Sequence, residues 1–152
     1  MPPSKLNQPA RKLFACHLAD IKYYDPDGWY WQIPGTQNNI TIVMVWVQGI
    51  VVEVDMAMDH VMIDDGTGVV EVIAEDVRRI KKLPRDQMLV QKGSYVMVVG
   101  SLQLSEGCNH QVIKAVKITC LDTETAPHET HWMLEVLHYH KQLRISEQGT
   151  IR

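Results

Sequence analysis

Apolar residues alternate with polar or small residues along most of this chain, which is the period of half-buried β-strands. The longest such run covers 40–54 and is too rich in β-branched residues for a stable helix. Gly49 lies in its middle, where the missing Cβ allows a bulge or a tight coil. We therefore predict one long first strand that bends at Gly49 and serves both sides of a small barrel.

Shorter segments continue the alternation and complete a β-rich domain. They cover 61–63, 69–73, 95–104 and 111–119. The first two flank the turn sequence Asp64-Asp65-Gly66-Thr67-Gly68, whose carboxylates and glycines supply the hydrogen bonds and positive φ angles of a tight reversal. We predict a hairpin at this turn, with Asp64 and Asp65 capping backbone amides, and a second bulge at Gly100.

Two segments have helical spacing. Residues 74–82 carry Val77 and Ile80 before Pro84, which predicts a short helix between the third and fourth strands. Pro127 suits the first position of a longer helix. Its apolar stripe consists of Trp132, Val136, Tyr139 and Leu143, and Met133, Leu137 and His140 widen it.

Five strands with a helix after the third is the order of the OB-fold. The predicted fold class is therefore all-β: a single five-stranded OB-fold barrel with a short helix between strands 3 and 4 and a C-terminal helix. The predicted organisation is an N-terminal arm, partly irregular, over 1–39, the barrel over 40–122, an interaction helix over 126–144 and a tail over 145–152.

The predicted arm contains five prolines, and only 13–21 offer a plausible short helix. The arm also holds six of the ten aromatic residues of the chain. A free tail seldom carries that much apolar area, because exposed aromatic side chains favour association. We therefore expect part of the arm to dock on the rest of the protein.

Charge argues against strong nucleic-acid binding. Fifteen basic and eighteen acidic residues give a net charge of −3, whereas autonomous binders carry a basic excess. The basic concentration consists of Arg78, Arg79, Lys81, Lys82, Arg85 and Lys92, opposed by Glu75, Asp76 and Asp86. The second and third strands offer no aromatic side chains on which bases could stack. A solvated basic face is favoured, and a single-stranded DNA-binding or telomere-type OB subunit using 78–92 is the alternative.

Other function classes find little support. The three cysteines lack CxxC spacing and no apolar run approaches a membrane span, so we expect a soluble protein of a reducing, intracellular compartment. His128 is followed four residues later by Trp132, whereas the zinc-protease motif needs a second histidine there. No set of nucleophile, base and oxyanion donors is present. We expect no catalysis, cofactor or metal.

The apolar stripe of the last helix has two physical interpretations. It can close its own barrel, or it can bind a partner, with Trp132 as an anchor of the kind that dominates interfaces. The width of the stripe allows both.

Four stretches together resemble the RecQ-mediated genome instability protein 2 family. They are 45–52, 93–100, 115–119 and the helix start His128-Glu129 after Pro127, with Trp132 and Leu134 to Val136. The resemblance covers most of 45–137. The aromatic segment 23–31 and the turn at Asp64 depart from the mammalian form.

The resemblance implies a non-catalytic OB-fold protein of the nucleus. Such a protein pairs with a second OB domain, at the C-terminus of RecQ-mediated genome instability protein 1, much as subunits of replication protein A pair. Through that partner it belongs to the complex of Bloom helicase and topoisomerase III alpha, which dissolves double Holliday junctions and suppresses crossovers in homologous recombination. The paired surface can also receive the Fanconi anaemia group M protein.

The same resemblance implies a partner-binding set and no strong direct DNA binding. The set consists of Trp132, Met133, Leu134, Val136, Leu137, Tyr139 and Leu143 on the helix, together with Lys12 in the arm.

Overall fold

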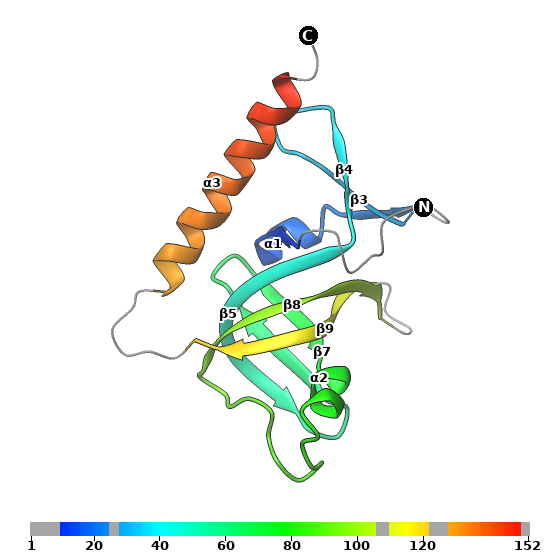
Figure 1. Ribbon diagram of the computed structural model, residues 1–152, viewed down its shortest axis with the longest axis vertical. Helices are drawn as coiled ribbons and strands as arrows, with labels where there is room; N and C mark the ends of the chain where they lie inside the picture. Colours follow the sequence, from blue (N-terminus) through cyan, green and yellow to red (C-terminus); the bar gives the residue numbers. More distant parts are fainter. Residues whose placement is uncertain (1–9, 25–27, 106–109, 122–127, 150–152) are drawn as a thin grey trace.

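The computed structural model describes residues 10–24, 28–105, 110–121 and 128–149, arranged as strands and helices around one β-rich body (Figure 1). The strands are β1 Arg11–Lys12, β2 Lys22–Tyr24, β3 Gly28–Gln32, β4 Asn39–Ile42, β5 Met44–Asp55, β6 His60–Asp64, β7 Val69–Ile73, β8 Tyr95–Leu104 and β9 Gln111–Cys120. The helices are α1 Ala15–Leu18, α2 Glu75–Ile80 and α3 His128–Gly149.

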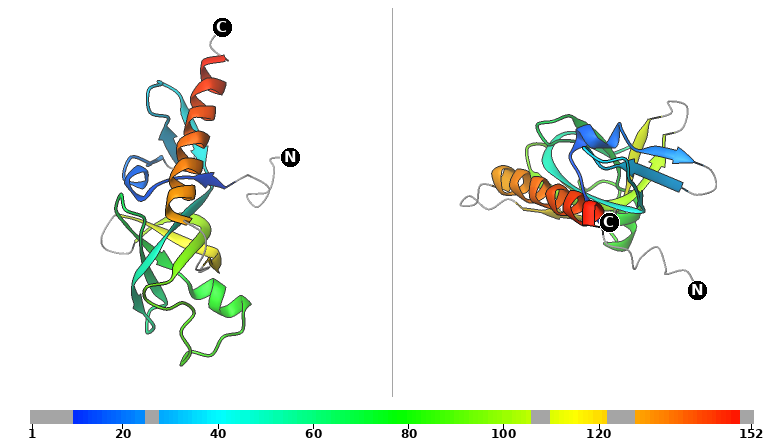
Figure 2. Two further views of the ribbon diagram at one scale, coloured as in Figure 1. Left: turned by 90° about the vertical axis from the view of Figure 1, so that its left-hand side faces the viewer. Right: turned by 90° about the horizontal axis from the view of Figure 1, so that it is seen from above.

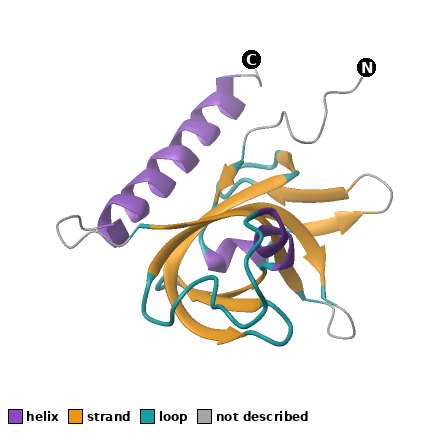
Figure 3. Ribbon diagram, turned by 60° about the horizontal axis from the view of Figure 1, so that its bottom comes forward, coloured by secondary structure: helices purple, strands orange, loops and turns teal. Residues whose placement is uncertain are grey.

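The main sheet is built around β5, which pairs with two strands. Its first half, Met44 to Ile50, is antiparallel to β8, and its second half, Ile50 to Asp55, is antiparallel to β6. The remaining pairings run β6–β7, β7–β9 and β9–β8 and return to β5. In Figure 3 the strands accordingly curve around a common interior. The strand order and the short helix α2 after β7 confirm the prediction of an OB-type β-fold with a C-terminal helix.

The two glycines selected from the sequence act differently. A Cβ on Gly49 would lie 2.5 Å from the backbone oxygen of Asp64, so this glycine permits β5 to cross closely over β6. The register shift of β5 lies later, between Val51 and Glu53, so the bulge is not at Gly49 itself. The prediction that one strand serves both sides is confirmed, because β5 passes from β8 to β6 at Ile50. The predicted bulge at Gly100 is confirmed by a register shift between Val99 and Gly100.

The hairpin predicted at Asp64 to Gly68 joins β6 and β7. Asp64 Oδ1 accepts a hydrogen bond from the amide of Gly66 at 2.8 Å, and Asp65 Oδ1 accepts one from Thr67 at 2.8 Å. Asp65 Oδ2 also accepts a hydrogen bond from the amide of Ala15 at 2.6 Å. The turn therefore closes the hairpin and holds the start of α1.

The segment predicted as a partly irregular arm carries strands and a short helix through much of its described length. Strands β2, β3 and β4 form a separate antiparallel sheet in which Tyr23 pairs with Trp29 and Trp31 pairs with Ile40. Trp31 and Ile33 are buried in the main core. The aromatic side chains provide the apolar area that makes this small sheet stable on the barrel.

Helix α3 lies along the outside of the molecule, beside β5 and the small sheet (Figures 1 and 2). It continues to Gly149, beyond the predicted end at 144, whereas Pro127 lies outside the described residues. Within the described part of the chain, no helix has the length and apolarity needed to span a membrane.

Candidate partner-binding surface

Helix α3 has two apolar faces. The inner face consists of Trp132, Val136, His140 and Leu143, which recur at intervals of three and four residues. Trp132 is 2% exposed and Val136 is fully buried, and Leu143 packs against the main core. The inner face thus attaches α3 to its own domain.

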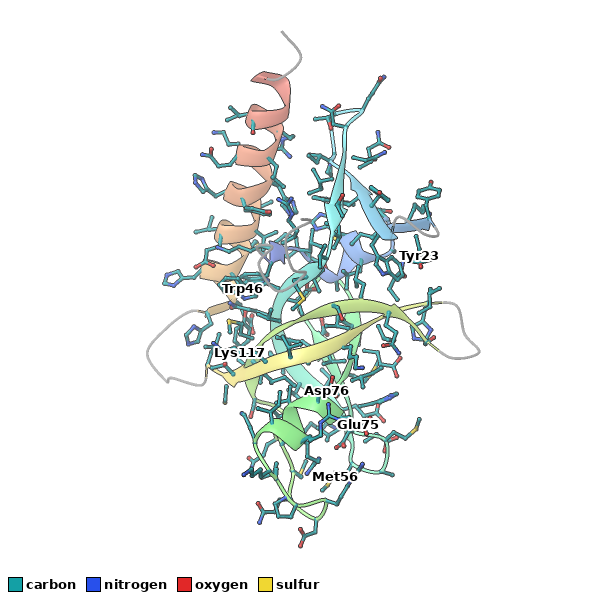
Figure 4. The ribbon with its side chains drawn as sticks, turned by 45° about the vertical axis from the view of Figure 1, so that its right-hand side comes forward. Tyr23, Trp46, Met56, Glu75, Asp76 and Lys117 are labelled. Carbon is teal, nitrogen blue, oxygen red and sulfur yellow. The ribbon has the colours of Figure 1, made fainter. Side chains whose placement is uncertain are left out.

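Trp132 packs on Trp46 of β5. Their rings are stacked with centroids 5.7 Å apart, and Phe14 and Val136 complete the cluster. Figure 4 shows Trp46 on the side of β5 that faces α3. Neither indole N–H has a hydrogen-bond partner among the described residues. The cluster is therefore held by apolar contact and ring stacking.

The short strand β1 also contacts α3 through its two side chains. The ammonium of Lys12 lies 4.8 Å from the centre of the Trp46 ring and 3.7 Å from Glu135 Oε2. The guanidinium of Arg11 donates a hydrogen bond to the Tyr139 hydroxyl at 3.0 Å. Lys12, implied by the resemblance as a partner contact, is thus placed at the joint between β1, β5 and α3.

Two histidines lie in this joint. His140 Nε2 donates a hydrogen bond to the Lys12 carbonyl at 2.8 Å, which fixes the tautomer of a neutral ring. The ring of His17 meets it edge-on at 4.7 Å, and Trp31 packs on both. Burial lowers the pKa of His140 and that of His17 from 6.5. The sequence pattern placed His140 in the stripe but gave no reason to pair it with His17.

The outer face of α3 consists of Met133, Leu134, Leu137 and Ile145. Their side chains are 50%, 60%, 52% and 53% exposed, respectively. By the turn of about 100° per residue, Leu134 and Ile145 lie across the helix from Trp132 and Val136, and Met133 and Leu137 lie on the flank between the two faces. A helix that is apolar on both sides is normally covered on both sides. The outer face is therefore a surface suited to a partner.

The structure divides the predicted partner-binding set. Met133, Leu134 and Leu137 are on the outer face, whereas Trp132 and Val136 are buried within the chain and Tyr139 and Leu143 are half-buried. Of the two interpretations of the stripe, Trp132 follows attachment to its own domain, and its place in the partner-binding set is corrected because Phe14 and Trp46 cover it. Those two residues are more than 80 positions away in the sequence, so helical spacing could not reveal them.

A pocket of about 270 Å³ adjoins the outer face near the start of α3. Phe14, Ile50, Val52 and Met133 line its apolar part. Tyr95 also lines it, and burial raises the pKa of this phenol, which therefore stays protonated. The pocket extends the apolar surface from α3 onto β5.

The basic segment serves mostly internal contacts. Arg78 is 6% exposed; its Nε donates to Asp59 at 2.7 Å, and its Nη1 donates to the carbonyls of Pro84 and Gln87. Arg85 lies 3.1 Å from the other oxygen of Asp59. Arg78 was a candidate phosphate contact in the alternative of a DNA-binding subunit, and its burial removes it both from that set and from the favoured solvated face.

The rest of the segment is more accessible. Arg79 pairs with Asp76 at 2.7 Å, and Lys81 Nζ donates to the carbonyl of Ile118 at 3.4 Å. Lys82 is exposed with a left-handed backbone, φ 54°. No group of three His, Cys, Asp or Glu side chains suited to a metal ion occurs among the residues that the structure describes.

Comparison with known sequences points to one family. Residues 9–140 match the family described as RecQ-mediated genome instability protein 2. The chain is similar to the protein of that name from Gallus gallus, with 29% identity over 75% of this chain and 80% of the relative. The Mus musculus protein of that name is 31% identical over 68% of this chain and 63% of the relative.

Comparison with solved structures shows the OB-fold. The S. pombe Stn1–Ten1 complex contains a chain that matches with a TM-score of 0.67 and 18% identity, covering 93% of this chain and 99% of that chain. A replication protein A heterotrimer bound to single-stranded DNA contains another, with a TM-score of 0.62 and 17% identity, covering 89% and 98%.

Proposed function

The chain belongs to the RecQ-mediated genome instability protein 2 family, and from this premise we propose that it is a non-catalytic OB-fold subunit that holds a genome-stability complex together. The partner we propose is the C-terminal OB domain of RecQ-mediated genome instability protein 1. Through it, the chain stabilises the nuclear complex of topoisomerase III alpha and Bloom helicase that dissolves double Holliday junctions and suppresses crossovers.

The outer face of α3 is the observation that carries the proposal. Met133, Leu134, Leu137 and Ile145 leave about half of each apolar side chain in water. Complete burial of such a side chain contributes about 1.5–3 kcal/mol, so roughly half of that remains to be gained at each position. A facing helix that covers the outer face would recover it.

The inner face supports the same proposal by making α3 rigid. Stacking on Trp46, the Arg11–Tyr139 hydrogen bond and the His140–Lys12 hydrogen bond fix the helix before a partner arrives. A surface held in its bound position loses less conformational entropy on association. The two similar structures also support a role in an assembly, because one is a Stn1–Ten1 complex and the other is a replication protein A heterotrimer.

Titration calorimetry of the full chain with the partner's C-terminal OB domain tests the proposal. We expect a saturable complex, and we expect Leu134→Glu to weaken it at least tenfold, because a buried carboxylate would face apolar side chains. Ser146→Ala is the matched control, since Ser146 is an exposed polar residue of the same helix that does not belong to the outer face. A wild-type chain that does not bind, or a Leu134→Glu variant that binds as tightly as wild type, would contradict the proposal.

A further inference from the structure

A second surface lies on the barrel away from α3. A groove of about 580 Å³ runs from the β5–β6 turn to the end of β8 and the start of β9, over the outer side of β7. Figures 1 and 2 place the end of β8 on the side of the barrel opposite α3. OB-folds bind extended ligands over the corresponding strands and loops.

The groove has an apolar floor and an acidic rim. Met58, Ile73 and Val112 supply the floor, and Met58 is 61% exposed. Asp55 and Glu75 lie on the rim, and Figure 4 shows Glu75 at the start of α2. An exposed methionine beside half-buried Ile73 and buried Val112 suits an aliphatic ligand group.

Glu71 is a carboxylate of the groove that is held through both of its oxygens. Its two oxygens accept hydrogen bonds from His60 Nδ1 at 2.6 Å and from His110 Nε2 at 2.8 Å. The hydroxyl of Ser105 lies 3.0 Å from the other ring nitrogen of His110. The hydrogen bond from His110 lowers the pKa of Glu71 more than burial raises it, so the carboxylate is charged at neutral pH. These bonds hold a negative charge in a fixed position before any ligand binds.

The charges exclude a phosphate backbone. The carboxylates of Asp55, Glu71 and Glu75 outnumber the single ammonium of Lys114 in the lining of the groove. Lys114 is also directed in part to Asp76, at 3.7 Å. The described lining contains no Phe, Tyr or Trp on which a base could stack.

We propose that this groove binds an extended protein segment in which Lys or Arg side chains alternate with aliphatic residues. Alternate side chains of a strand point to opposite sides, but a twisted segment lying in a groove can place aliphatic groups on the floor and cations at the rim. Cationic side chains near Glu71 and Glu75 find complementary charge, and their methylene stems cover the floor. The inference does not rest on the pairing of α3 with a partner.

Fluorescence anisotropy of the full chain with a labelled nine-residue peptide of alternating lysine and leucine tests the proposal. We expect saturable binding that weakens with salt, and no binding of the matched peptide of alternating glutamate and leucine. Glu71→Gln should weaken binding about threefold or more, because it removes one charge and keeps the side-chain shape. Lys114→Gln should tighten binding about twofold, an effect that a misfolded variant cannot imitate.

Asp86→Asn is the control, because it removes one exposed carboxylate outside the groove lining. It should leave the affinity unchanged. Amide chemical shifts of the wild-type chain should change on β6, β7 and β9 when the lysine–leucine peptide is added. Equal binding of both peptides, shifts confined to α3, or unchanged affinity in both Glu71→Gln and Lys114→Gln would overturn the proposal.

Discussion

The inner and outer faces of α3 carry similar apolar side chains but have different surroundings. Trp132 and Val136 are covered by Phe14 and Trp46, whereas Leu134 and Leu137 remain about half exposed or more. The difference shows that hydrophobicity along one helix serves two purposes, attachment to the domain and presentation of a surface. Substitutions on the two faces should therefore change different quantities.

The largest effect is expected on the inner face at Trp132. Trp132→Ala should lower the free energy of unfolding by about 3–5 kcal/mol, because it leaves a cavity beside Trp46 and Phe14. Urea denaturation followed by circular dichroism measures the change. Met133→Ala, one position along the helix and 50% exposed, is the control and should stay within about 0.5 kcal/mol of wild type. A Trp132→Ala variant of wild-type stability would show that the inner face does not attach α3.

Val136 and Leu137 are adjacent in the sequence but belong to the inner and outer faces of α3, so substitutions at these two positions compare the faces directly. Val136→Ala should cost about 1–3 kcal/mol of stability, since Val136 is fully buried. Leu137→Ala should leave stability nearly unchanged but weaken the proposed partner complex by on the order of 1–2 kcal/mol. Denaturation and calorimetry on both variants provide the comparison. If Leu137→Ala lost stability and kept its affinity, the assignment of the faces would be reversed.

The attachment of the inner face should depend on pH through His140 and His17. Burial lowers both pKa values below 6.5, so the unfolded chain binds protons that the folded chain excludes. Above about pH 6.5 both histidines are mostly neutral in the folded and the unfolded chain, so they do not lower the free energy of unfolding. As the pH decreases from there toward the lowered pKa values, the unfolded chain takes up protons first and the free energy of unfolding falls. Denaturation at pH 7.5 and 5.5 measures the fall.

His140→Gln is the variant for this test, because a glutamine amide can still donate to the Lys12 carbonyl but does not titrate. The stability of this variant should depend less on pH between 7.5 and 5.5 than that of wild type. An identical pH dependence would remove His140 from the explanation.

The sequence was sufficient for the strands of the OB-type fold because strand alternation is a local signal. The hairpin at Asp64 and the bulge at Gly100 followed from residue types that few other conformations favour. The small sheet was missed because Pro26, Gly28 and Pro34 interrupt the alternation of Tyr23, Trp29 and Trp31. Its stability comes from burial against the core, which strand pattern alone does not contain.

The candidate site was predicted in part for a similar reason. Spacing identified α3 and its apolar positions, but it could not tell which face the chain itself covers. That choice depends on Phe14 and Trp46, which only the fold brings to Trp132. In the same way, the charge of Arg78 was visible in the sequence, whereas its enclosure by Asp59, Pro84 and Gln87 was not.

The smallest effect on stability is expected at Lys12, whose ammonium lies between Trp46 and Glu135. Removing this one charge tests whether Lys12 attaches α3 to the domain or contacts a partner. Lys12→Gln removes the cation over Trp46 and the contact with Glu135, which should cost about 0.5–1 kcal/mol of stability, because both contacts are partly exposed. If Lys12 acts only in attaching α3, its affinity for the proposed partner should change less than twofold in calorimetry under conditions where the variant is folded. A much larger loss of affinity with unchanged stability would place Lys12 in the partner interface, as the family resemblance implies, and would extend the outer face of α3 across β1.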